Sequence, residues 1–91
     1  MAASIEEYVV TPHAAFEMQR RGIGESVVAQ VLAAPEQREA VRPGRDRLQS
    51  RMRIGGRVYL VRVFVDVDRN PAEGVTVYRT SKSSKYWRGE P

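Results

Sequence analysis

Histidine, glutamate, arginine and lysine side chains occur in two segments of this 91-residue chain at spacings that suit acid–base chemistry on a phosphate. In the first segment, His13, Glu17 and Arg21 recur every four residues, which places them along one side of a helix. In the second, Lys82 and Lys85 follow a strand at a spacing of about one helical turn. Imidazole can act as base or acid near pH 7, and ammonium groups can stabilise charge on a phosphate.

Simpler interpretations exist for each of these residues. His13 also fits a surface or helix-capping histidine, and Arg20 and Arg21 also fit solvated cations at a helix end. The two lysines could belong to a frayed C-terminal tail. Tyr86 and Trp87 count against a simple tail, because such rings usually dock or stack.

Two short helices are expected to carry the first segment. Thr11 and Pro12 suit the N-cap and first helical position of a helix that runs to about Arg21, where Gly22 suits a left-handed C-terminal cap. A second helix is expected over about 25–34, with an apolar stripe of valines and a leucine, ended by Pro35.

Strands are expected to follow. Alternation of apolar and polar residues, or strand-like composition, predicts strands over 37–42, 46–54, 57–68 and 75–80. Gly55-Gly56 favours a two-residue hairpin turn. The order predicts a single α+β domain over 1–91, with two N-terminal helices packed on one face of a three- to four-stranded antiparallel sheet.

Charge is distributed unevenly along the chain. Residues 1–37 contain two arginines and five glutamates, a net charge of −3, whereas residues 38–91 contain thirteen basic and six acidic residues, a net charge of +7. The calculated isoelectric point is near 10, which is typical of nucleic-acid-binding domains. An arginine-rich but merely solvated sheet face would give the same pattern; the arginines favour phosphate contacts.

Several classes of protein are not expected. The chain has no cysteine and one histidine, so no disulfide, metal site or cofactor is predicted. No apolar run approaches the roughly 20 residues of a membrane span, and the N-terminus does not read as a signal peptide. We therefore expect a cytoplasmic protein without a membrane partner.

Two sequence motifs give a family resemblance. HAAFEMQRRGI (13–23), followed by VLAAPE, and VTVYRTSKSSKYW (75–87) together resemble a family of small bacterial domains of unknown function. That family is similar to the RelE/ParE-like toxins, especially BrnT, within the group of metal-independent ribonuclease folds that includes barnase and the colicin nucleases. The resemblance covers almost the whole chain in the order of its elements.

The resemblance implies a RelE-like fold and an RNA-cleaving or translation-inhibiting toxin restrained by a cognate antitoxin protein. Many relatives carry arginine where this chain has Glu17, so Glu17 could pair with a cation, act as a base or mark a repurposed site. The residues that match polar motif positions of the family are His13, Arg21, Thr80, Lys82, Lys85 and Tyr86.

The leading hypothesis is a metal-independent endoribonuclease that acts through the 2′-hydroxyl of RNA. His13 or Glu17 would be the base, and Arg21 with the two tail lysines would stabilise the phosphorane. Substrate would be held by a further set of residues, Arg20, Arg79, Thr80 and Tyr86. This hypothesis requires the first helix and the tail to meet at one cationic cleft.

The alternative hypothesis is a non-catalytic basic module that binds nucleic acid or a protein. Inhibition of a protein target, as in ParE-like toxins, belongs to this alternative. The same cations serve both hypotheses, and the difference lies in whether His13 and Glu17 perform chemistry.

Overall fold

The computed structural model describes residues 3–87 and contains five strands and three helices in that range. In chain order these elements are β1 (Tyr8–Val10), α1 (Pro12–Arg21), α2 (Glu25–Ala33), β2 (Gln37–Arg42), β3 (Arg45–Ile54), β4 (Arg57–Asp66), β5 (Ala72–Thr80) and α3 (Ser83–Tyr86).

Helix α1 begins and ends where the local sequence predicts. The hydroxyl of Thr11 accepts a hydrogen bond from the backbone N–H of Ala14 at 3.2 Å, and Pro12 occupies the first helical position. Gly22 ends the helix in the left-handed region with φ of 67°, a conformation that side chains with a Cβ rarely adopt. The caps fix the direction in which α1 leaves β1 and the position of its last turn.

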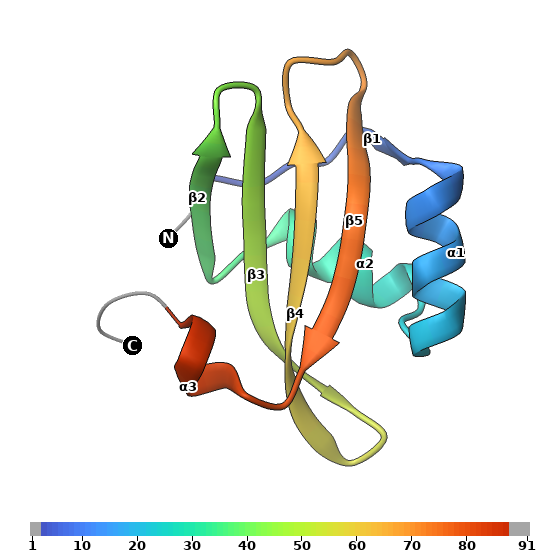
Figure 1. Cartoon of the computed structure of the whole chain (residues 1–91), viewed down its shortest axis with the longest axis vertical. Helices are drawn as coiled ribbons and strands as arrows, with labels where there is room; N and C mark the ends of the chain where they lie inside the picture. The colour runs from blue at the N-terminus through green and yellow to red at the C-terminus, as the bar shows by residue number, and fades with distance from the viewer. Residues whose placement is uncertain (1–2, 88–91) are drawn as a thin grey trace.

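All five strands belong to one sheet, in the order β1-β5-β4-β3-β2 (Figure 1). From β2 to β5, each strand pairs antiparallel with the next along the chain, and β3 and β4 are joined by Gly55 and Gly56, both with positive φ. Strand β1 pairs in parallel with the start of β5, so that Val9 is opposite Glu73. The sheet is therefore mixed.

The α+β class is confirmed, but the expected sheet of three or four antiparallel strands preceded by helices is wrong. The difference arises at the N-terminus, where the three residues of β1 come before α1 and add a parallel strand at the β5 edge. Three residues are too few to show a strand periodicity, and their partners lie more than sixty positions further along the chain.

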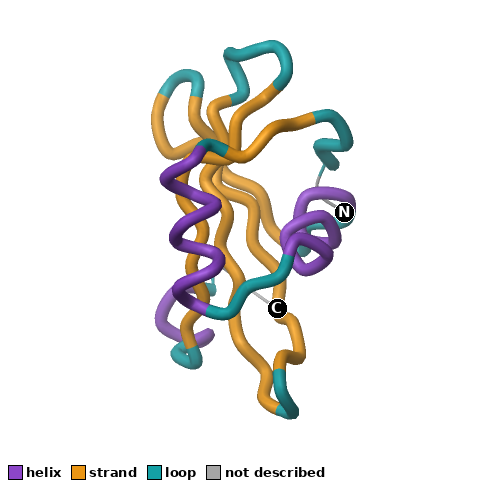
Figure 2. Tube along the Cα trace, turned by 90° about the vertical axis from the view of Figure 1, so that its right-hand side faces the viewer, coloured by secondary structure: helices purple, strands orange, loops and turns teal. Residues whose placement is uncertain are grey.

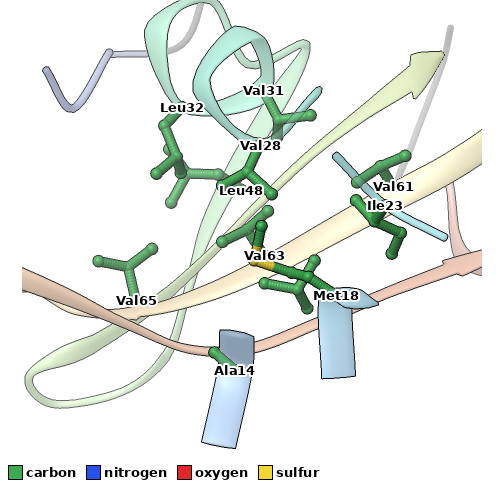
Figure 3. Close-up of a cluster of buried hydrophobic side chains, with 11 residues drawn as sticks. Ala14, Met18, Ile23, Val28, Val31, Leu32, Leu48, Val61, Val63 and Val65 are labelled. Atoms are coloured by element: carbon green, nitrogen blue, oxygen red, sulfur yellow. The ribbon is translucent and has the colours of Figure 1, made fainter. Parts of the chain in front are cut away.

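The core lies between helices α1 and α2 and one face of the sheet. It is a cluster of buried side chains that includes Met18 of α1, Val28 of α2 and Val63 of β4 (Figure 3). The alternation of β4 sends Val61, Val63 and Val65 into this cluster and the intervening residues to the opposite face. Hydrophobic burial thus fixes which strand residues face away from α2.

The three helices take different positions around the sheet. Helix α1 runs alongside β5, whereas α2 packs against β3 and β4 (Figure 1). Figure 2 shows α2 and the one-turn helix α3 on opposite sides of the sheet. The face that is turned away from α2 is therefore covered in part by the C-terminal segment.

Candidate functional site

Side chains of the three central strands form the face of the sheet turned away from α2, which we call the outer face. Their positions alternate with the buried core residues of the same strands. The outer face comprises Arg47, Gln49 and Arg51 of β3, Leu60, Arg62 and Phe64 of β4, and Thr76, Tyr78 and Thr80 of β5.

Arg62 lies at the middle of the outer face and is almost fully buried, with 6% of its surface exposed. Its Nε donates a hydrogen bond to Oε1 of Gln49 at 2.9 Å, and one terminal nitrogen donates to the hydroxyl of Tyr78. Three aromatic rings surround the guanidinium, with centroids 4.6 Å (Tyr86), 5.6 Å (Tyr78) and 5.9 Å (Phe64) from its central carbon. All these partners are electrically neutral.

Within residues 3–87, Arg62 takes part in no ion pair, unlike the other arginines of its sheet face. Arg47 pairs with Glu39, and Arg51 pairs with Glu36 at 3.1 Å. A buried charge is costly to desolvate, and the cost is usually offset by an opposite charge. Cation–π contacts and neutral acceptors offset it only in part here, so the site retains an unneutralised positive charge.

Two ion pairs at the margins of this face shift the titration of their carboxyl groups. A hydrogen bond from Arg51 holds the pKa of Glu36 below its ordinary value, and one from Arg45 does the same for Asp66. These carboxylates are committed to their own arginines at neutral pH.

The C-terminal segment covers the part of the outer face near the end of β5. The carbonyl oxygen of Tyr86 accepts a hydrogen bond from Nε2 of Gln49 at 3.3 Å, and the ring of Trp87 lies 4.1 Å from the guanidinium carbon of Arg51. Helix α3 is a single turn with no side-chain cap and no buried residue. Few interactions therefore hold it over Arg62.

The last turn of α1 reaches the same face from the β5 edge. Glu17 accepts a hydrogen bond from Nε of Arg21 at 2.8 Å, and the Arg21 guanidinium lies 5.9 Å from the ring centroid of Tyr78. The side chain of Glu17 is 13% exposed. Glu17, Arg21, Tyr78 and Arg62 thus form a continuous series of contacts.

His13 does not lie with this group. It is exposed in the first turn of α1, near Thr11, whose backbone N–H donates to the carbonyl of Gly74 at 3.0 Å. Arg21 is about 12 Å further along the helix axis, and Thr80 is about 20 Å along β5 from Gly74. The common cleft expected for His13, Lys82 and Lys85 is not formed, because α1 and β5 run side by side with His13 at their starting ends (Figure 1).

The tail lysines lie at the start of α3 and within it. Lys82 is the N-cap residue, its backbone N–H donating to the hydroxyl of Thr80 at 3.1 Å, and Nζ of Lys85 lies 5.5 Å from the Tyr86 ring. Both side chains are exposed and close to the outer face. Among the expected substrate-binding residues, Thr80 and Tyr86 therefore lie on or against this face.

Two other expected binding residues point elsewhere. Arg20 is exposed and lies 6.0 Å from the ring of Phe16 on α1. Arg79 alternates with Tyr78 and so lies on the α2-facing side of β5, where its guanidinium is 4.4 Å from the ring of Tyr59.

The central residues Arg62, Gln49 and Tyr78 were not among the site residues expected from the sequence. One signal was present: Arg62 stands between Leu60 and Phe64 on one face of a strand whose other face is all valine in its middle. An arginine at such a position is exposed only if no other segment covers that face of the sheet. The partners of Arg62 come from other strands and could not be named before the strand register was known.

Other features of the described residues lie apart from this group. A cavity of about 620 Å³ between α1, α2 and β1 is lined mainly by apolar side chains, with Glu25 as its one charged residue. In residues 3–87, no three His, Asp or Glu side chains are close enough to hold a metal ion. Neither α1, α2 nor α3 is long and apolar enough to cross a membrane.

Comparison of the chain with protein-family models, with curated protein sequences and with solved structures gives no match. The outer face must therefore be interpreted from its own chemistry.

Proposed function

We propose that this protein binds RNA through the outer face of its sheet, with Arg62 as the central phosphate contact. The observation that carries the proposal is the buried guanidinium of Arg62, which has only neutral partners within residues 3–87. A phosphodiester would supply the missing negative charge, and a guanidinium is well suited to phosphate oxygens.

The surrounding residues support the same ligand. Lys82 and Lys85 are exposed in the C-terminal tail, and Arg21 approaches Tyr78 from the edge of the sheet. The carboxylates near this face are paired with arginines, which reduces their repulsion of a phosphate. The remaining positive charge would attract RNA and make the affinity depend on salt.

The test is the affinity of a fluorescently labelled RNA oligonucleotide, measured by anisotropy at several salt concentrations. Arg62→Gln should weaken binding at least about tenfold and lower the salt slope by about one. Arg57→Gln is the matched control, because Arg57 is exposed at the β3–β4 hairpin, away from this group. A folded Arg62→Gln protein that binds RNA like the unmodified chain would refute the proposal.

A second candidate function is metal-independent RNA cleavage. The observation that favours it is the contact series from the Glu17 carboxylate through Arg21 and Tyr78 to Arg62. Glu17 would accept the proton of the 2′-hydroxyl as its oxygen bonds to phosphorus, and the two guanidiniums would stabilise the phosphorane. The bond to the 5′-oxygen would break, leaving a 2′,3′-cyclic phosphate and a 5′-hydroxyl protonated by water.

Cleavage is tested by incubating RNA with the purified chain in EDTA and identifying the fragment ends. Glu17→Gln should lower the rate by about 10²–10⁴, whereas His13→Ala should leave it unchanged. Intact RNA in the presence of measurable binding would exclude this candidate and leave the binding proposal standing. Loss of cleavage on changing His13 would show that the base has been assigned wrongly.

From the resemblance to RelE- and BrnT-like toxins, we further propose that the protein acts in a toxin–antitoxin system. A RelE-like fold and a cognate antitoxin partner are part of this proposal. Expression of the chain in bacteria, with and without the neighbouring reading frames, would test it through growth.

A further inference from the structure

The middle of the outer face, beside Arg62, carries an aromatic pair. The rings of Phe64 and Tyr78 come from adjacent strands, with centroids 6.3 Å apart and planes inclined by only 15°. Both residues are half-buried. Phe64 is opposite Thr76, at the midpoint of β5, and Tyr78 lies further toward the end of β5, next to the part that α3 covers. In the described part of the chain, no helix lies in front of the half of the sheet nearer the start of β5 (Figure 1).

The pair is surrounded by groups that suit a nucleic-acid strand. Arg62 lies within 6 Å of both ring centroids, and Thr76 is directly opposite Phe64 in the strand register. Two nearly parallel rings beside a cation can stack on successive bases while the cation contacts the phosphate that joins them.

We infer that the outer face selects single-stranded RNA, with bases stacked on Phe64 and Tyr78; this inference rests on the proposed RNA binding. In a duplex the bases are already stacked and paired, so their faces are not available to a side chain on a sheet. The positive charge of Arg62 would attract either form of RNA, but stacking on the aromatic pair would raise the affinity only for the single-stranded form. The specificity follows from the ring faces of these two side chains, which would contact bases and not the phosphate.

The test compares a single-stranded oligonucleotide with the same sequence in a duplex, at one salt concentration. The single strand should bind at least about fivefold more tightly than the duplex. Phe64→Leu should weaken binding of the single strand at least about fivefold. Phe64→Leu should leave duplex binding unchanged, since leucine keeps the apolar contact but has no ring face. An abasic oligonucleotide, which retains every phosphate, should bind the unmodified protein as weakly as the duplex does.

The matched control is Phe16→Leu. Phe16 is the other phenylalanine of the chain, 58% exposed on α1 and outside the outer face, so its replacement should change neither affinity. Equal affinities for single strand, duplex and abasic strand would overturn the stacking inference and leave phosphate binding intact. Absence of binding to all three would overturn the proposed function as well.

Discussion

At the scale of single residues, the unusual feature is a buried cation stabilised by neutral groups. Arg62 depends on the hydroxyl of Tyr78 and the amide oxygen of Gln49 for its hydrogen bonds. A buried donor without an acceptor destabilises the folded state by more than an average hydrogen bond stabilises it, because the donor has also lost its hydrogen bonds to water. The folded state therefore tolerates Arg62 only while these two acceptors are present.

Tyr78→Phe should lower the free energy of unfolding by about 1–3 kcal/mol, since it keeps the ring but leaves a nitrogen of Arg62 without its acceptor. Tyr59→Phe is the control, because the ring of Tyr59 contacts arginines on the other face and its hydroxyl has no hydrogen bond within residues 3–87. Urea denaturation measures both variants. Similar losses in the two proteins would contradict the role given to the Tyr78 hydroxyl.

At the scale of elements, α3 and α1 bring different kinds of residue to the same sheet face. Helix α1 is fixed by its caps and by the burial of Ala14 and Met18, so it delivers Arg21 to a defined position. Helix α3 is one turn long and contacts the sheet through Tyr86, with Trp87 following it. A phosphate can reach the buried Arg62 only if a segment that covers this side chain moves. Helix α3 is the most weakly held of the elements that cover Arg62.

RNA binding should therefore shift the fluorescence of Trp87, the one tryptophan of the chain. Its ring stacks on Arg51 in the free protein, and displacement of α3 would expose it to water and move its emission to longer wavelength. The shift should follow the same binding curve as anisotropy and be lost in Arg62→Gln. Saturated RNA binding with an unchanged emission spectrum would show that α3 stays in place.

At the scale of the whole molecule, charge is divided between the early and late parts of the chain. The segment that contains β1, α1 and α2 is acidic, and the segment that supplies strands β2 to β5 and the tail is basic. The excess of basic residues that gives the chain its net charge of +4 therefore lies in the part that forms the outer face. The ion pair of Asp66 with Arg45 joins β4 and β3 within that basic part, and the pair of Glu36 with Arg51 joins the acidic part to β3.

Stability should be constant from pH 7 to about pH 5 and fall below about pH 4. The pKa values of Glu36 and Asp66 are lowered by their arginines, so these groups add stability above their unfolded-state pKa values. That stability is lost as the pH falls through the folded-state values. Urea midpoints at pH 7, 5 and 3 measure it, and the double variant Glu36→Gln, Asp66→Asn should show a smaller fall at pH 3. An equal fall in both proteins would assign the effect to other groups.

Short-range patterns predicted much of the fold. The caps at Thr11 and Gly22, the helix over 25–33, the Gly55-Gly56 turn and the alternation of β4 all depend on residues a few positions apart, and the structure contains each of them. The α+β class follows from their order. The expectation that Lys82 and Lys85 span one helical turn also agrees with α3, whose N-cap is Lys82.

What the sequence by itself determined was therefore α1, α2, the strands β2 to β5 and the two faces of β3, β4 and β5, because these depend on local backbone geometry and periodic burial. Tertiary structure alone decided that β1 joins the sheet, that His13 lies far from the tail, and that Arg62 is buried beside Tyr78. These outcomes depend on strand register and on the direction of α1 along β5, which are set by contacts between residues far apart in the chain.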